Sequence, residues 1–167
     1  LEREGWDLDE IAVLYRSNAQ SRVIEQSLFR SGIPYKIYGG LRFYERQEIK
    51  HALAYLRLAV NPDDDNALLR VINFPPRGIG ARTIENLQTA STEQGITLWQ
   101  AACNAGAKAA KVAAFVRLIE ALSNQVGQMP LPEIIVGILK DSGLTEHYKT
   151  QKGDNQDRLD NLDELVN

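Results

Sequence analysis

Several residue types and patterns that mark secreted or membrane proteins are scarce in this sequence. Cys103 is the single cysteine among 167 residues, so no disulfide can form within the chain, which fits a reducing compartment. The apolar runs are only a few residues long, too short to span a membrane, and residues 1–5 lack the apolar centre of a signal peptide. We therefore expect a soluble cytoplasmic protein.

Patterns that carry catalysis are missing as well. The sequence has no G-x-x-x-x-G-K-[ST] loop for nucleotide phosphates and no Ser/His/Asp or Cys/His nucleophile set. His51 and His147 have no metal-ligating neighbours, which favours a solvated helix face for each. The acids at 63–65 follow Asn-Pro, where helix capping explains them better than metal binding. We predict no catalytic residue and no metal site in this chain.

The balance of charge allows a local basic surface but no global one. The net charge is −3, so no overall field attracts a polyanion. Acidic residues collect at 63–65 and 154–164, which leaves other surfaces free to be basic. Any nucleic-acid contact would therefore be confined to a small part of the molecule.

The apolar pattern changes along the chain. Residues 11–16 and 35–38 predict two strands on either side of a helix at 19–30, a strand–helix–strand unit that cannot form a complete sheet. From residue 45 onward the spacing is helical. Because the chain starts at a leucine and stops within a helical pattern, we expect a piece of a larger protein.

These patterns predict a mainly α protein in which a helical domain is attached to a partial α/β element. The expected division is 1–44 for the partial α/β element, 45–154 for the helical insertion domain and 155–167 for a return segment. The layout is that of a helical insertion within an α/β domain.

Residues 74–87 form the most informative stretch. An apolar helix end leads into a tight Gly-Ile-Gly turn at 78–80 and then into a second helix, flanked by Arg77 and Arg82. A helix N-terminus gathers partial positive charge, and glycines let an anion approach the backbone, so a nucleic-acid phosphate is the natural ligand. The alternative is a helix C-cap and a tight turn without a ligand. In either case we expect Ile79 to pack into the core.

Two further segments carry polar or aromatic residues suited to nucleic acid. Residues 15–22 lie where the first expected strand feeds a helix, the place where ligands bind in open α/β sheets; a capped, solvated helix start is the alternative. Tyr44 could stack on a base, whereas packing is favoured for Phe43. Arg46 could pair with Glu45 or Glu48 instead of phosphate.

Four segments resemble, in the same order, the superfamily 1A DNA helicases of the UvrD/Rep/PcrA type. They are residues 11–22, 38–50, 77–80 and 158–165. The resemblance covers essentially the whole chain. It implies that 1–44 and 155–167 belong to the second RecA-like domain, 2A, and that the helical middle is its insertion, 2B, with a helix–hairpin–helix-type turn.

The resemblance also implies roles for particular residues. The expected duplex contacts are Arg77, Gly78, Ile79, Gly80, Arg82 and Thr83, with Lys50 and Arg57 as weaker candidates. The expected single-strand contacts are Arg16, Ser17, Asn18, Arg22 and Tyr44, and the expected hinge residues are Gly39, Gly40, Lys152 and Gly153. The family's ATP-binding lysine, metal-binding acids and arginine fingers fall outside this chain, so ATP and Mg²⁺ would belong to the parent protein.

The implied function is the DNA-binding and regulatory portion of an ATP-dependent 3′–5′ DNA helicase in DNA repair, in the bacterial cytoplasm and nucleoid. Its expected partners are DNA without sequence preference, the rest of the helicase chain and DNA-repair proteins, with no membrane. The alternative is a protein-interaction or autoinhibitory module that docks repair partners through exposed Trp99, Tyr148 and the helix at 111–122. Phosphate binding weakens steeply with salt and apolar docking does not, which separates the two. A stand-alone helix–hairpin–helix protein conflicts with the α/β element.

Overall fold

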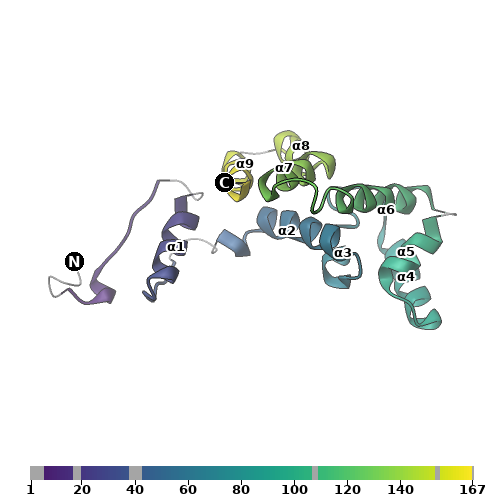
Figure 1. Ribbon diagram of the computed structural model, residues 1–167, viewed down its shortest axis with the longest axis horizontal. Coiled ribbons are helices and arrows are strands. Elements are labelled where there is room, and N and C mark those ends of the chain that lie inside the picture. The colour runs from purple at the N-terminus through teal and green to yellow at the C-terminus, as the bar shows by residue number, and fades with distance from the viewer. Residues whose placement is uncertain (1–5, 17–19, 38–42, 107–108, 153–154, 167) are drawn as a thin grey trace.

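The computed structural model describes residues 6–16, 20–37, 43–106, 109–152 and 155–166. In these ranges the chain is mainly α, as predicted, and contains no strand (Figure 1). The helices are η2 (Leu8–Glu10), α1 (Ser21–Arg30), η4 (Phe43–Glu45), α2 (Gln47–Val60), α3 (Asp65–Val71), α4 (Ala81–Gln94), α5 (Leu98–Gly106), α6 (Ala110–Ser123), α7 (Leu131–Asp141), α8 (Leu144–Thr150) and α9 (Gln156–Val166). None of these helices is both long enough and apolar enough to cross a membrane.

The two predicted strands are not formed in the described residues, and this prediction was wrong. Residues 11–16 and 33–37 have no regular secondary structure, and no backbone hydrogen bond joins them. Both segments instead line a groove beside α1. A parallel pair needs a ladder of backbone hydrogen bonds along its whole length. Two short segments separated by a groove cannot make that ladder, although their apolar runs are typical of strands.

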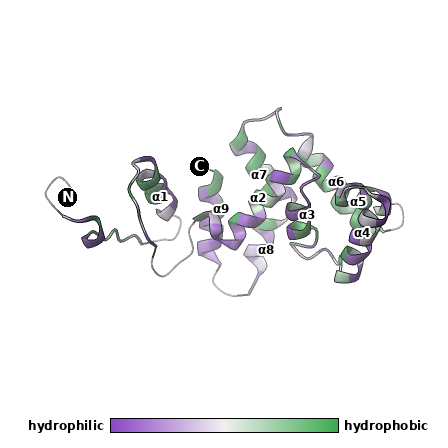
Figure 2. Cartoon of the chain, turned by 90° about the horizontal axis from the view of Figure 1, so that it is seen from below, coloured by the Kyte–Doolittle hydropathy of each residue, from purple (hydrophilic) through white to green (hydrophobic). Residues whose placement is uncertain are grey.

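A single core extends from η4 to α9, with α2 near its centre. Helix α2 packs against α3, α6, α7 and α9, so the last helix of the chain lies beside a helix that starts at Gln47 (Figure 1). Helix α9 carries mostly hydrophilic residues and buries Asn161, Leu162 and Leu165 (Figure 2). The core also contains Phe43, which is fully buried as expected.

The start of α3 follows the predicted capping chemistry. The Asp64 carboxylate accepts a hydrogen bond from the backbone N–H of Ala67 at 3.0 Å, so Asp64 is the N-cap. Such caps stabilise a helix by about 1 kcal/mol. The described residues contain no group of three His, Cys, Asp or Glu side chains placed to hold a metal ion.

His51 lies in the core, which corrects the expectation of a solvated position. It is 8% exposed, its ring stacks on Phe74 with centroids 3.8 Å apart, and its Nδ1 lies 3.3 Å from the Tyr148 hydroxyl. His147 is half-buried and meets the edge of Phe74 at 4.9 Å. The Phe74 ring and helix α8 cover this face of α2, which a helix-by-helix pattern does not reveal.

This burial makes stability depend on pH. Burial, followed by the positive charge of Arg70, lowers the pKa of His51 from 6.5 to about 4. Between pH 6.5 and pH 4 the unfolded chain therefore binds a proton at His51 that the folded chain does not bind. The free energy of unfolding is highest above pH 6.5 and falls as the pH drops toward 4. We expect a loss of about 2 kcal/mol between pH 7 and pH 5 from this group.

Urea unfolding at the two pH values tests this prediction. A His51→Phe variant keeps an aromatic ring against Phe74 and should lose most of the pH dependence. His147→Gln is the control and should retain it. An unchanged pH dependence in His51→Phe would show that another group is responsible.

Candidate nucleic-acid interface

The Gly-Ile-Gly turn (Gly78–Gly80) is fixed by a side chain that the sequence analysis missed. The Asn73 Oδ1 atom accepts hydrogen bonds from the backbone N–H groups of Arg77 at 2.9 Å and Ile79 at 3.0 Å. Ile79 is 1% exposed and packs into the core, as predicted. Asparagine commonly bonds nearby backbone in turns, so an asparagine shortly before a turn is the signal that could have identified it.

A buried tyrosine holds the segment before the turn. The Tyr55 hydroxyl, from α2, donates to the Phe74 carbonyl at 2.6 Å and lies 3.3 Å from that of Val71. Burial raises the pKa of this hydroxyl well above its usual value, so it remains a protonated donor. The Phe74–Pro75 peptide bond in this segment is cis.

The two glycines of the turn serve different purposes. Gly78 has φ +72°, in the left-handed region, and a Cβ atom there would lie 2.5 Å from the Lys111 Nζ. Gly80 is extended, with φ −79° and ψ 170°, and a Cβ atom there would meet nothing within 4 Å. Neither backbone geometry nor packing requires glycine at 80, so its effect is to leave open space at the start of α4.

The first turn of α4 is positively polarised. It contains no acidic residue and no side chain caps it, and the N–H groups of Thr83 and Ile84 bond to the Gly80 carbonyl at 3.0 and 3.2 Å. The preceding amides, those of Ala81 and Arg82, have no intrahelical acceptor. Arg82 is exposed, and no partner for its side chain occurs in the described part of the chain. An anion at this end of α4 would be favoured.

A hollow of about 310 Å³ opens beside the turn. Its lining comes from the turn and α4 (Gly78, Ile79, Thr83) and from the start of α6 (Ala109, Ala110, Lys111, Val112). The structure thus brings three predicted duplex contacts together with a second helix N-terminus. Lys111 was not among the predicted residues.

Arg77 is half-buried and bonded to neighbouring parts of the fold. Its guanidinium donates to the carbonyls of Pro75 at 2.9 Å and Ser142 at 2.6 Å, with a longer bond to Val71 at 3.4 Å. It also lies over the rings of Tyr55 and Phe115, 5.6 and 5.9 Å from their centroids. Arg77 and Arg82 therefore differ, since Arg77 fastens the turn to the end of α7 and Arg82 projects from the surface.

The other predicted duplex residues lie on α2, outside the hollow. Arg57 forms an ion pair with Asp64 at 2.6 Å, which offsets part of its positive charge locally. Lys50 is exposed. A duplex contact by either residue stays a prediction.

The predicted single-strand residues are dispersed over the start of the chain. Arg16 is exposed, whereas the Arg22 guanidinium contacts the backbone carbonyl of Glu164, lies 3.5 Å from its Oε1 and stands over the Phe43 ring. Tyr44 is 49% exposed and meets Phe43 edge-on at 5.1 Å. Ser17 and Asn18 lie outside the described residues.

Buried polar residues occupy the region near the predicted hinge. Arg46 donates to Asn161 Oδ1 at 2.7 Å and to Ser21 Oγ at 2.8 Å, and Asn161 donates to Glu48 Oε1 at 2.7 Å. This polar network joins α1, the start of α2 and α9. The sequence suggested Glu45 or Glu48 as a partner of Arg46 and did not predict Asn161 or Ser21. Of the hinge residues, Lys152 is exposed, and Gly39, Gly40 and Gly153 lie outside the described part.

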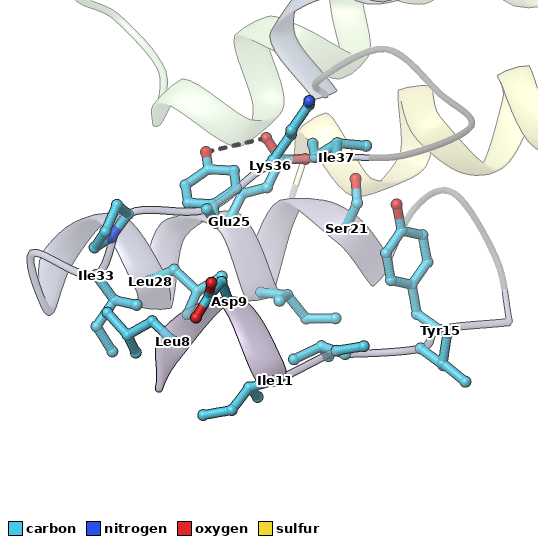
Figure 3. A pocket seen from close by; sticks show the side chains of 16 residues that line it. Leu8, Asp9, Ile11, Tyr15, Ser21, Glu25, Leu28, Ile33, Lys36 and Ile37 are labelled. Atoms are coloured by element: carbon cyan, nitrogen blue, oxygen red, sulfur yellow. Dashed lines mark hydrogen bonds between the residues drawn. The ribbon is translucent and has the colours of Figure 1, made fainter. Parts of the chain in front are cut away.

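An apolar groove of about 930 Å³ runs between α1 and the segments at 8–15 and 33–37. Figure 3 shows the side chains of Leu8, Leu28 and Ile33 gathered at one end and Tyr15 at the other. Val13 is 54% exposed, so apolar surface is open on this side of the molecule.

The surfaces expected to dock proteins are largely used in the core. Tyr148 is 2% exposed, and the apolar side of α6 is buried through Val112, Phe115 and Ile119. Trp99 is half-buried against the same core. The expectation that Tyr148 is exposed was therefore wrong.

Comparison with known proteins agrees with a helicase-derived domain. All 167 residues match the UvrD-like helicase C-terminal domain, and the chain belongs to this family. DNA helicase II of Escherichia coli strain K12 is 48% identical over 170 residues, which cover 97% of this chain and 24% of that protein. DNA helicase II of Haemophilus influenzae strain Rd is 51% identical, covering 97% and 23%.

The ATP-dependent DNA helicase PcrA of Bacillus subtilis strain 168 is 42% identical over 166 residues, covering 95% of this chain and 22% of that protein. The resemblance to superfamily 1 helicases is therefore confirmed. The chain spans about a quarter of the length of these relatives.

Proposed function

We propose that this chain is the DNA-gripping and regulatory portion of an ATP-dependent 3′–5′ DNA helicase that acts in DNA repair. The observation that carries the proposal is the open, uncapped N-terminus of α4, where Gly80 leaves the backbone accessible and Arg82 is exposed. Support comes from the relatives, which are named as DNA helicases.

Phosphates of a duplex would contact this end of α4 through backbone N–H groups, the Thr83 hydroxyl and Arg82. Lys50 would add a more distant contact, and Arg16 and Tyr44 would contact a single strand. Because all these groups would contact the sugar–phosphate backbone or the face of a base, the binding would be independent of the DNA sequence.

The remainder of a longer helicase would supply what this chain does not contain. We infer that residues 1–44 and 155–167 form part of a RecA-like 2A domain, that 45–154 form the 2B insertion, and that the rest of the 2A domain covers the apolar groove beside α1. ATP and Mg²⁺ would bind in that remainder, and DNA-repair proteins would be further partners in the bacterial cytoplasm.

The proposal is tested by binding this chain to a fluorescent duplex with a single-stranded tail across a salt titration. We expect affinity to fall steeply with salt. Thr83→Ala should weaken binding by about 10-fold, the loss of one hydrogen bond to a charged group. Gly80→Leu should weaken it further because its side chain occupies the open space.

Thr92→Ala is the matched control for Thr83→Ala. Thr92 is exposed at the other end of α4, where its hydroxyl bonds to the Gln88 carbonyl at 2.9 Å. It should bind DNA like the unaltered chain. Equal low-salt affinity in all variants would contradict a phosphate-binding role for the turn.

A further inference from the structure

We propose that Lys111, from α6, is a further phosphate contact, so that the duplex is held between two helices. This inference rests on the proposed function. Lys111 is distant from the Gly-Ile-Gly turn in the sequence, but it would place a positive charge beside that turn in the folded chain.

The position of Lys111 is set by direct packing on the turn. It is the second residue of α6, and its side chain passes so close to Gly78 that a Cβ atom there would lie 3.3 Å from Cδ, 3.1 Å from Cε and 2.5 Å from Nζ. The end of the Lys111 side chain therefore lies beside Gly78, with the ammonium group nearest, and both residues line the hollow.

The charge at this place is uncompensated in the described part of the chain. Lys111 is exposed, and no carboxylate of the described residues lies within 4.0 Å of its ammonium group. The first turns of α4 and α6 contain no acidic residue. A fixed ammonium beside two positive helix ends makes the hollow favourable for an anion.

The chemistry of the lining favours a phosphate on a polymer over a small free anion. The walls of the hollow include Ile79, which is buried in the core, and Val112, whose side chain offers no hydrogen bond. A free ion would find few donors there. A backbone phosphate held by the turn needs only one added point charge, and the ammonium group of Lys111 beside Gly78 supplies it.

The test adds Lys111→Ala, Lys111→Arg and a control to the salt titration. A plot of log K against log salt has a negative slope, and the loss of one phosphate contact makes that slope less steep by about 0.9. We expect that change for Lys111→Ala, with affinity at low salt about 5-fold to 10-fold weaker, and recovery of the slope in Lys111→Arg. The control is Lys149→Ala, an exposed lysine on α8 outside the hollow, which should leave the slope unchanged.

The outcomes separate this inference from the proposed function. If Thr83→Ala weakens binding but Lys111→Ala leaves the slope unchanged, the inference is overturned and the turn keeps its role. If the unaltered chain does not bind the duplex at low salt, both are overturned. Thermal unfolding should be the same for Lys111→Ala and the unaltered chain, because the side chain is exposed.

Inorganic phosphate distinguishes a DNA site from a free-anion site. At constant ionic strength, we expect added phosphate to leave duplex binding unchanged. Displacement of the duplex by phosphate that disappears in Lys111→Ala would identify a free-phosphate site and overturn the assignment to DNA.

Discussion

An Arg46→Ala variant is expected to unfold with about 3 kcal/mol less free energy than the unaltered chain. Arg46 is 7% exposed and donates to Asn161 and Ser21, which are 2% and 1% exposed. Removal of the guanidinium leaves two buried acceptors without their donor. It also leaves the buried Glu48 carboxylate with less positive charge nearby.

Urea unfolding measures this loss, and a double-mutant cycle assigns it to the network. Asn161→Ala alone should be strongly destabilising, and the two substitutions together should cost less than their sum by about 1 to 3 kcal/mol. Lys50→Ala, at an exposed position of α2, is the control and should change stability by less than about 0.5 kcal/mol. Additive losses would show that Arg46 and Asn161 act independently.

The polar network lies where two separate passages of the chain meet. Arg46 and Glu48 follow the first predicted hinge glycines by a few residues, Asn161 follows the second hinge, and Ser21 belongs to α1. Hydrogen bonds among these four side chains thus connect the segments next to the two predicted hinges. Loss of the Arg46 side chain would therefore weaken the contacts of α2 with both α1 and α9.

Local patterns predicted most of the helical architecture. The helical spacing from residue 45 onward, the cap at Asp64, and the burial of Phe43 and Ile79 are all present in the structure. The helices and the cap depend on neighbours within a turn or two, which the sequence displays directly, and Phe43 and Ile79 follow the general tendency of large apolar side chains to be buried. The predicted strands failed because a strand is defined by its partner, and apolar composition does not supply one.

The missed features depend on residues that meet only after folding. His51 and Tyr148 are buried in contact with each other and beside the ring of Phe74, and the spacing of apolar residues in α2 or α8 does not predict that cluster. Lys111 lies on another helix from the turn whose Gly78 it covers. Sequence spacing predicts which face of a helix is apolar, but it does not predict which distant side chain covers a given turn.

Arg77 and Arg82 show the same limit, because their different surroundings appear only in the folded chain. Both flank the turn in the sequence, but only Arg77 is bonded to the carbonyls of Pro75 and Ser142 and packed over two aromatic rings. We expect Arg77→Ala to lower the free energy of unfolding by about 2 to 3 kcal/mol, because two charged hydrogen bonds are lost where the side chain also packs.

Arg82→Ala should behave in the opposite way. Its side chain is exposed, so stability should change by less than about 0.5 kcal/mol, while duplex affinity at low salt should fall by about 5-fold with a smaller salt slope. Urea unfolding and DNA titration of both variants measure the two effects separately. If Arg82→Ala bound DNA normally and a folded Arg77→Ala had a reduced salt slope, Arg77 would be the phosphate contact. Its bonds to the two carbonyls would then have to open when DNA binds.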